Sequence, residues 1–351
     1  MRREPPATNT VEQRMFEPGP LTGFRGPVVC AGSGRMGRSM AIAFAYAGMQ
    51  VILLDLKPRD ATALRAQQGQ AMAEIDDHLG SLRRAGLIGD SDVQRLGARI
   101  AFAAAGDAAQ VLRNARLVLE GVPEKLEDKR AAFATIEAAA PEGCIIASTT
   151  SSFLAGELAA MLSDSARFLN AHWLNPAYLI PVVEVSPHDG TDATVTEALC
   201  AVLAGIGKVP IVCRPSPGYI VPRLQALVMN EAARLVEEGV ASAADIDRAV
   251  RLGFGMRYAS MGVLEFVDYG GVDILHYASG YMAGKVDADR YRSPDLVGRL
   301  MADGDIGLRS GRGFYDWSAL DAGDYRDRLL ARLAGWLRSE GLLAPPVEDS
   351  L

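Results

Sequence analysis

The sequence predicts an α/β domain with a mostly parallel sheet, followed by an all-α domain. Three observations support this prediction. From Gly26 onward, short apolar segments alternate with segments of helical spacing. Near Pro215 a stretch with two prolines and a glycine ends the alternation, and the sequence after it is almost entirely helical in pattern. The length of 351 residues suits two domains better than one.

The expected strands of the first domain are short and apolar: Val28–Ala31, Val51–Asp55, Arg99–Phe102, Leu117–Glu120, Cys144–Ser148, Phe168–His172, Pro181–Val185 and Pro210–Cys213. Segments of helical spacing lie between several of them, at Met36–Ala47, Ala61–Ala85, Lys125–Ala139 and Ala193–Gly205. Strands that alternate with helices favour a parallel sheet. The strands that begin at Phe168 and Pro181 have no helix between them, so an antiparallel or mixed portion is expected there.

The C-terminal part predicts helices. Arg223–Glu238 is strongly amphipathic, Ala244–Arg251 continues the helical pattern, and a final helix covers about Tyr325–Ser339. Residues 1–24 are rich in Pro, Glu, Arg and Thr and predict a flexible extension. We therefore expect the α/β domain at 25–214, a helical domain at 215–318 and a C-terminal helical extension at 319–351.

Composition and charge exclude several functional classes. The net charge of −7 argues against binding to nucleic acid or to an acidic membrane surface. No apolar run is long enough to span a bilayer, and no apolar signal core follows the basic first residues, so a cytoplasmic protein is expected. The four cysteines form no CxxC pair, which argues against a disulfide framework or a metal site. Cys30 and Cys144 are interpreted as small buried hydrophobes.

The turn after the first strand carries the GxGxxG pattern of a Rossmann-type dinucleotide-binding domain, as Gly32-Ser33-Gly34-Arg35-Met36-Gly37. The pattern alone is a weak signal, but here it follows an apolar strand and opens a helix, and the next strand ends in Asp55. The three glycines permit the tight turn, the approach of the backbone to a pyrophosphate, and close packing of the helix on the strand. Asp55 would bind the adenosine ribose and repel a 2′-phosphate, which predicts NAD; Lys57 and Arg59 are close enough to weaken that preference.

A histidine and a glutamate are the candidates for catalysis. His172 ends an apolar strand, and Glu184, twelve residues later, is a charged residue in an otherwise apolar strand. The burial of a carboxylate costs free energy unless a hydrogen-bond donor or an opposite charge is paired with it. An imidazole beside a carboxylate can take the proton of a hydroxyl while a hydride leaves the same carbon. From the spacing alone, an ordinary core histidine is an equally good interpretation.

Taken together, the motifs resemble the 3-hydroxyacyl-CoA dehydrogenase family, and the resemblance runs from about Gly26 to Trp317. Besides the glycine turn, the matching segments are Glu120-Gly121-Val122-Pro123-Glu124, Ser148-Thr149-Thr150-Ser151-Ser152, His172-Trp173-Leu174-Asn175-Pro176, Val183-Glu184-Val185, Pro217-Gly218-Tyr219-Ile220-Val221 and Gly307-Leu308-Arg309-Ser310-Gly311-Arg312-Gly313-Phe314-Tyr315. Their common order and spacing are highly specific.

The resemblance implies catalytic roles at four positions. His172 matches the catalytic histidine of the family and Glu184 its acidic partner. Ser151 matches a serine that contacts the substrate oxygen and the cofactor, and Asn175 lies in the same active-site turn. Simpler interpretations remain for two of them, since Ser151 could cap a helix that begins near Phe153 and Asn175 could merely form a turn.

The resemblance also places Glu124 and Lys129 near the nicotinamide ribose. Lys129 could instead be an exposed helical charge. Two departures from the family concern the substrate pocket: Pro222 stands where the family usually has an asparagine, and Thr149 replaces the asparagine of an Asn-Thr-Ser-Ser stretch. Because proline has no amide side chain, a polar contact near the reacting carbon is missing.

A further segment, Gly253-Phe254-Gly255-Met256-Arg257-Tyr258-Ala259, resembles the branch that includes L-gulonate 3-dehydrogenase and lambda-crystallin, whose members act on free hydroxy acids. Arg257 could bind a substrate carboxylate, or could lie at a helix end or a dimer interface. The segment Leu264–Tyr269 is more similar to 3-hydroxybutyryl-CoA dehydrogenases. Arg83 and Arg84 could contact a CoA tail or belong to a solvated helix end.

The predicted function is the reversible, NAD-dependent oxidation of the 3-hydroxyl of a short-chain 3-hydroxyacyl-CoA, a step of fatty acid metabolism. The alternatives are a dehydrogenase of a free hydroxy acid, similar to L-gulonate or carnitine, and a non-catalytic NAD-binding protein, which Pro222 leaves open. The expected partner besides the small-molecule substrate is a second copy of the chain. A homodimer through the helical domain is expected, because its apolar helices and the bend at Gly270-Gly271 suit close helix packing, and the family resemblance implies the same.

Overall fold

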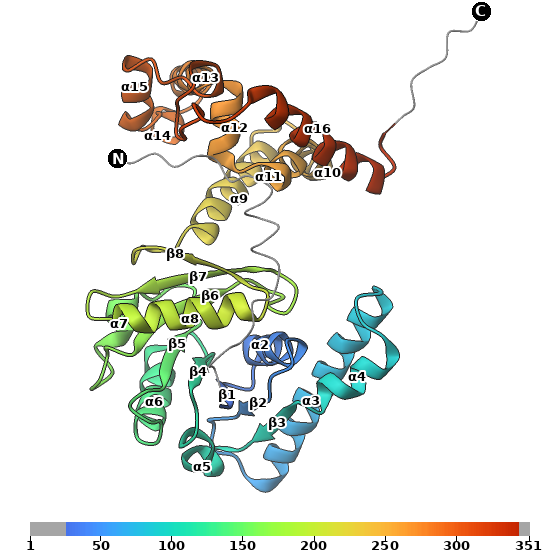
Figure 1. Cartoon of the computed structure of the whole chain (residues 1–351), viewed down its shortest axis with the longest axis vertical. Coiled ribbons are helices and arrows are strands. Elements are labelled where there is room, and N and C mark those ends of the chain that lie inside the picture. The colour runs from blue at the N-terminus through green and yellow to red at the C-terminus, as the bar shows by residue number, and fades with distance from the viewer. Residues whose placement is uncertain (1–25, 344–351) are drawn as a thin grey trace, which may run out of the picture. The chain divides into compact units, whose positions relative to one another are not determined.

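The computed structural model describes residues 26–343 (Figure 1), so the extension expected at 1–24 lies outside the described residues. The described chain divides into two compact units, 26–228 and 229–343, and the division falls inside helix α9 (Val221–Glu237). The boundary expected at residue 215 stays a prediction, because a single helix continues from one unit into the next.

The first unit contains an eight-stranded sheet in the order β3-β2-β1-β4-β5-β6-β7-β8. Its strands are β1 (Val28–Ala31), β2 (Val51–Leu54), β3 (Ile100–Ala103), β4 (Leu117–Glu120), β5 (Ile145–Ser148), β6 (Phe168–Trp173), β7 (Val182–Pro187) and β8 (Val209–Val212). All neighbouring strands pair in parallel except β6 and β7, which are antiparallel. The predicted fold class is confirmed, and so is the mixed portion of the sheet.

Helices cover both faces of this sheet. They are α2 (Arg35–Tyr46), α3 (Ala61–Arg84), α4 (Asp90–Gly97), α5 (Ala108–Leu112), α6 (Leu126–Glu137), α7 (Ala155–Ala159) and α8 (Ala193–Gly205). Alternate residues of β1 enter different cores: Val28 and Cys30 pack with α2, α3 and α8, whereas Val29 and Ala31 pack with α5, α6 and α7. Burial on both faces explains why the strands are continuously apolar rather than alternating.

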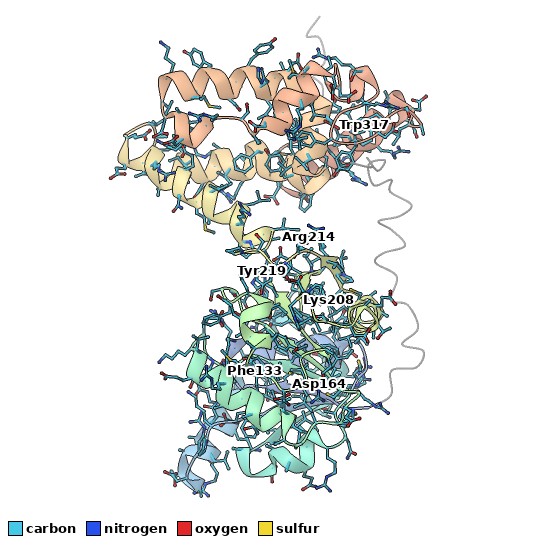
Figure 2. The ribbon with its side chains drawn as sticks, turned by 90° about the vertical axis from the view of Figure 1, so that its left-hand side faces the viewer. Phe133, Asp164, Lys208, Arg214, Tyr219 and Trp317 are labelled. Carbon is cyan, nitrogen blue, oxygen red and sulfur yellow. The ribbon has the colours of Figure 1, made fainter. Side chains whose placement is uncertain are left out.

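The cores of this unit are closely packed. On the second face Phe133 of α6, which is labelled in Figure 2, meets Phe168 of β6 edge to face, with ring centroids 5.4 Å apart. Cys30 and Cys144 are completely buried, as expected. Burial raises the pKa of the Cys30 thiol to about 12, which makes it an inert packing residue.

The second unit is helical, and no strand follows β8 among residues 213–343. After α9 it contains α10 (Ala243–Ala249), a π-helix (Val250–Gly255), α11 (Met256–Ser260), α12 (Val263–Gly270), α13 (Val272–Lys285), α14 (Ala288–Tyr291), α15 (Asp295–Ala302) and α16 (Ala322–Ser339). None of the helices between residues 26 and 343 is long and apolar enough to cross a membrane.

The final helix packs into this unit. It begins at Ala322, three residues before the predicted start, because the Asp321 side chain caps it by accepting the N–H of Asp324. Tyr325 and Leu329 of α16 pack in one core with Trp317, which is labelled in Figure 2. The described part of the region expected as a C-terminal extension therefore shares a hydrophobic core with the helical unit.

Candidate active site

The candidate site lies at the carboxyl ends of the parallel strands. Gly32 follows β1, Asp55 follows β2, Gly121 follows β4 and Thr149 follows β5, while His172 lies near the end of β6. Because β1, β2, β4, β5 and β6 are all parallel, these residues lie along one edge of the sheet. In open α/β sheets this is the edge at which ligands bind.

The three motif glycines are required for different reasons. A Cβ on Gly37 would lie 1.8 Å from the carbonyl oxygen of Gly32, and a Cβ on Gly32 would lie 2.6 Å from that of Gly121. Both glycines therefore allow the turn and the helix to pack closely. A Cβ on Gly34 would meet no protein atom within 4 Å. Protein packing does not explain Gly34, whereas the close approach of a ligand would.

A pocket of about 650 Å³ opens beside this turn. Its lining includes Gly32, Ser33, Gly34, Arg35, Met36, Asp55, Lys57, Arg59, Gln67 and Gly121. Helix α2 begins at Arg35, and its N-cap residue, Gly34, offers no side-chain hydrogen bond to the first turn. The free N–H groups of that turn suit a phosphate, and the buried Asp55 suits ribose hydroxyls. The pocket thus fits a dinucleotide.

His172 and Glu184 face each other across the antiparallel β6–β7 pair. Nδ1 of His172 lies 2.8 Å from Oε2 of Glu184, and both side chains are buried. An ionised carboxylate can only accept hydrogen bonds, so Nδ1 carries the hydrogen and the lone pair of Nε2 is left to accept a proton. The structure therefore gives His172 the tautomer that a general base requires.

The second oxygen of Glu184 is held by the start of α9. Oε1 accepts the backbone N–H groups of Ile220 (2.9 Å) and Val221 (2.8 Å). These donors lie where the positive end of the helix dipole favours an anion. Glu184 is completely buried, and its charge is stabilised by these two N–H groups and by the imidazole.

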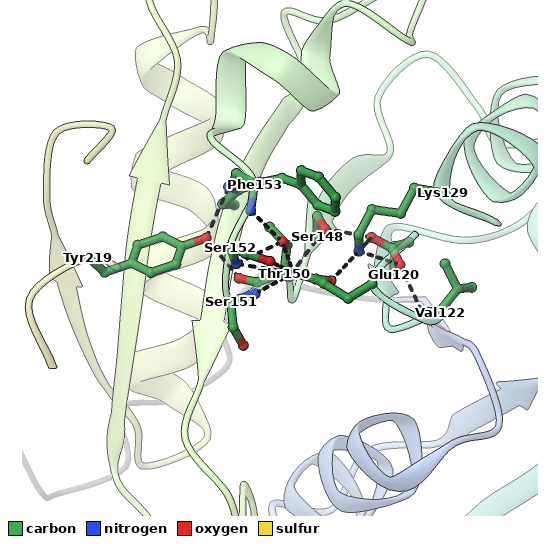
Figure 3. A network of polar contacts seen from close by, with 11 residues as sticks. Glu120, Val122, Lys129, Ser148, Thr150, Ser151, Ser152, Phe153 and Tyr219 are labelled. Carbon is green, nitrogen blue, oxygen red and sulfur yellow. Dashed lines mark hydrogen bonds and ion pairs between the residues drawn. The ribbon is translucent and has the colours of Figure 1, made fainter. Parts of the chain in front are cut away.

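Tyr219 is a residue of the site to which the sequence analysis assigned no role. Its ring stacks on the His172 ring, with centroids 4.8 Å apart and an interplanar angle of 6°. Its hydroxyl donates to the Thr150 carbonyl at 2.8 Å (Figure 3), and it accepts from Asn170 Nδ2 at 3.0 Å. Of the non-glycine residues in the described chain, only Tyr219 has φ in the left-handed region, at 47°. The sequence placed Tyr219 in a matching segment, residues 217–221, but no local pattern indicated the stacking.

Glu124 holds the turn that follows β5. It accepts the Thr150 hydroxyl, the N–H of Ser151 at 3.0 Å, and both the N–H and the hydroxyl of Ser152. Burial alone would raise the pKa of Glu124, but the hydrogen bonds from Thr150 and Ser152 and the charge of Lys129 outweigh it and lower the pKa to about 2. Glu124 is therefore ionised and fixes the turn.

Lys129 is completely buried between two carboxylates. Its Nζ lies 3.1 Å from Glu120 Oε2 and 3.2 Å from Glu124 Oε2. Glu120 also accepts the Ser148 hydroxyl at 2.5 Å and the N–H of Val122 at 2.7 Å. The interpretation of Lys129 as an exposed helical charge is therefore wrong. The sequence analysis assigned no role to Glu120, although it belongs to a matching segment. The signal was available, because Glu120, like Glu184, is a carboxylate in an apolar strand.

Ser151 and Asn175 are both exposed at this edge of the sheet. The side chain of Ser151 points away from the Glu124 network (Figure 3). It does not cap a helix, because α7 begins at Ala155 and its N-cap residue is Leu154. Asn175 lies in the turn after β6, which is anchored two residues later by a hydrogen bond from the N–H of Ala177 to the Ser39 hydroxyl.

The basic residues predicted to bind substrate have protein partners. Arg257 is in the helical unit, where its Nε donates to the Gly253 carbonyl at 2.8 Å and its guanidinium lies 4.9 Å from the centre of the Phe266 ring. Arg83 and Arg84, at the end of α3, form exposed ion pairs with Asp90 and Asp77, respectively. Neither Arg83 nor Arg84 lines the pocket beside the glycine turn.

Pro222 fits the place where it occurs. It is the second residue of α9, and the N–H groups of a first helical turn have no partner within the helix. A missing N–H therefore costs no helical hydrogen bond. Pro222 therefore does not disturb the start of the helix, where the N–H groups of Ile220 and Val221 hold Glu184.

Comparisons with known proteins find the same family over most of the chain. The family model for the NAD binding domain of 3-hydroxyacyl-CoA dehydrogenase matches residues 27–216, and the model for its C-terminal domain matches residues 218–317. A probable 3-hydroxyacyl-CoA dehydrogenase of Caenorhabditis elegans is 32% identical over 83% of this chain and 95% of its own.

The chain is also similar to a lambda-crystallin homolog and to a solved structure of a 3-hydroxyacyl-CoA dehydrogenase. A lambda-crystallin homolog of Bos taurus is 35% identical over 74% of this chain and 78% of its own. The crystal structure of a 3-hydroxyacyl-CoA dehydrogenase from Archaeoglobus fulgidus superposes with a TM-score of 0.72 at 28% identity, over 91% of this chain and 100% of the other.

Proposed function

This chain belongs to the 3-hydroxyacyl-CoA dehydrogenase family, and we propose that it interconverts a short-chain 3-hydroxyacyl-CoA and the corresponding 3-ketoacyl-CoA. Members of the family are NAD-dependent dehydrogenases that act on a CH–OH group, and NAD is the cofactor of this chain. The observation that carries the proposal is the His172–Glu184 pair, which lies at the same edge of the sheet as the glycine turn.

His172 acts on the proton of the substrate hydroxyl. Its Nε2 takes that proton as the C–O bond becomes a carbonyl, and the resulting imidazolium keeps its Nδ1–H on Glu184. NAD, when bound, supplies the hydride acceptor. In the reverse direction the imidazolium returns its proton to the carbonyl oxygen. Ile220 and Val221 hold the second oxygen of Glu184 in place through their backbone N–H groups.

Two exposed residues orient the substrate in this proposal. The hydroxyl of Ser151 donates to the reacting oxygen, and Glu124 keeps the turn of Ser151 in place. Asn175 contacts the substrate from the turn after β6. Tyr219 is a positioning residue, since its ring fixes the plane of the imidazole.

Contacts to the cofactor follow from the pocket and the network. The backbone of Gly32, Ser33, Gly34, Arg35 and Met36 binds the pyrophosphate, Gly37 brings the helix close to it, and Asp55 binds the adenosine ribose. Glu124 contacts the nicotinamide ribose. Lys129 acts through Glu124, because its ammonium is buried between two carboxylates.

The second candidate is oxidation of a free hydroxy acid. Three observations favour it: the identity to a lambda-crystallin homolog, the replacement of a pocket amide by Pro222, and the exposed Arg257 in the matching segment. The printed names of the C. elegans and A. fulgidus relatives favour the thioester. We therefore rank the thioester first.

Rates of NADH oxidation with acetoacetyl-CoA and with acetoacetate test this ranking. We expect the protein to turn over acetoacetyl-CoA and to turn over little acetoacetate. We also expect the Arg257→Met variant to have the same KM for acetoacetyl-CoA as the wild type. Turnover of free keto acids alone, with a KM that rises in Arg257→Met, would contradict the thioester and support the second candidate.

We also propose that the protein is a homodimer formed through its helical domain and that it acts in the cytoplasm, in fatty acid metabolism. Ile274, Tyr277 and Tyr281 lie on one side of α13 and are each at least 60% exposed, which suits contact with a second copy. The four free cysteines suit a reducing compartment, as expected for the cytoplasm.

Sedimentation tests the proposed dimer. A dimeric wild type and a monomeric Tyr277→Asp/Tyr281→Asp variant would support the interface on α13, and a monomeric wild type would contradict it.

A further inference from the structure

An ion pair lies inside the pocket proposed for the cofactor. Arg59 Nε is 2.5 Å from Asp55 Oδ2, and both residues line the pocket. The Asp55 side chain is only 4% exposed, whereas that of Arg59 is 24% exposed. Asp55 is therefore held at the end of β2, and the guanidinium is the more accessible member of the pair.

This pairing changes what the pocket offers to the cofactor. One oxygen of Asp55 is occupied by Arg59, so the other is left for the ribose hydroxyls. The neighbouring Lys57 is exposed and also lines the pocket. A 2′-phosphate would thus meet one carboxylate and two cations, rather than an uncompensated carboxylate.

We propose that Arg59 is a specificity-determining residue of the cofactor site. Paired with Asp55, it weakens the repulsion of a 2′-phosphate, so that the protein prefers NADH but also binds NADPH. When the carboxylate is removed, the freed guanidinium becomes a ligand of the 2′-phosphate. This inference rests on the proposed placement of the adenosine ribose beside Asp55, and it is independent of the substrate.

A purely structural role for Arg59 is the competing explanation. Arg59 directly precedes Asp60, whose side chain caps α3 by accepting the N–H groups of Thr62 and Ala63. In that case the ion pair would only fix the connection between β2 and α3. Loss of Arg59 would then lower stability and affect NADH and NADPH equally.

A double-mutant cycle separates the two roles. The proteins are the wild type, Arg59→Gln, Asp55→Asn and the double variant, with Arg65→Gln as a control that removes one positive charge from α3 outside the pocket lining. Dissociation constants for NADH and NADPH are measured by nicotinamide fluorescence in the absence of substrate. Thermal unfolding of each variant shows whether it is folded, and Arg59→Lys replaces Arg59→Gln if the latter unfolds.

We expect Arg59→Gln to weaken NADPH binding about tenfold relative to NADH, and Asp55→Asn to strengthen NADPH binding by about the same factor. The gain should be lost in the double variant, and Arg65→Gln should not change the ratio. An unchanged ratio in Arg59→Gln, or a gain that persists in the double variant, would overturn the proposal. If none of the proteins binds either nucleotide, the proposed cofactor site itself is wrong. If the protein does not turn over acetoacetyl-CoA, the substrate proposal is wrong, but the dissociation constants of this cycle still test the role of Arg59.

Discussion

His172 and Glu184 are paired in the sheet as well as through their side chains, since they lie directly opposite each other in the β6–β7 register. The sheet therefore fixes the separation of the two backbones, and the hydrogen bond fixes the ring. The start of α9 fixes the carboxylate from the other side. Such a base is oriented before the substrate arrives, so little reorganisation is needed during proton transfer.

Replacement of the carboxylate tests its contribution. In Glu184→Gln the amide oxygen can still accept the N–H groups of Ile220 and Val221, but the imidazolium loses its negative partner. We expect kcat to fall about 100-fold, which is within the range of contributions from general acid–base catalysis. Steady-state kinetics measure the fall, and a change of less than threefold would show that Glu184 only supports the fold.

Tyr219 should act through its ring more than through its hydroxyl. Tyr219→Phe keeps the stacking on His172 and loses hydrogen bonds to Thr150 and Asn170, so we expect a loss of about 1 kcal/mol in the free energy of unfolding and nearly normal kcat. Tyr219→Leu loses the stacking as well, and kcat should fall at least about tenfold while the KM for NADH changes little. Equal kcat values for the two variants would argue against a positioning role.

Glu124 should make the protein sensitive to acid. Its pKa is lowered in the folded state to about 2 from an ordinary value of 4.5, so its ionised form stabilises the fold above about pH 4.5, and this contribution is lost as the pH falls toward 2. In Glu124→Gln the thermal unfolding midpoint should fall less over that interval than in the wild type. The side chain is 38% exposed, so solvent screens its contribution. Glu127→Gln, an exposed carboxylate of α6, is the control, and identical pH profiles for wild type and Glu124→Gln would contradict the expectation.

Two glycines of the turn should respond differently to the same substitution. Gly34→Ala places a methyl group where no protein atom lies within 4 Å, so the protein should remain folded while NADH binding weakens at least about tenfold. Gly37→Ala would force a Cβ to within 1.8 Å of the Gly32 carbonyl oxygen and should prevent stable folding. Circular dichroism and NADH titration distinguish the two outcomes. Normal NADH affinity in Gly34→Ala would place the pyrophosphate elsewhere.

Most of the fold was predictable because its signals are local. Each strand is a short apolar segment, and the longer helices lie in the segments between them. Every expected strand is found with its ends shifted by at most two residues. The antiparallel β6–β7 pair followed from the missing helix between them. The helices α4 and α5 were not predicted, because segments of eight and five residues are too short to be recognised from their spacing alone.

The candidate site was predictable only where one residue type stood out in its segment. His172 and Glu184 are conspicuous in apolar strands, but the stacking of Tyr219 joins residues 47 positions apart and has no local signal. The burial of Lys129 was missed for the same reason, since it lies on α6, whereas the carboxylates that enclose it belong to the last residue of β4 (Glu120) and to the loop after that strand (Glu124). Charged residues on a helix are usually solvated, and only the tertiary fold reveals this exception.

The central claim is that His172 is the base of a dehydrogenase, and the most direct test is the rate of acetoacetyl-CoA reduction by His172→Ala together with its affinity for NADH. We expect kcat to fall about 1000-fold while the dissociation constant of NADH stays within about threefold of the wild-type value, because His172 handles the proton and does not line the dinucleotide pocket. His276→Gln, on α13 of the helical unit, should retain normal turnover. A His172→Ala variant with nearly normal turnover would contradict the account.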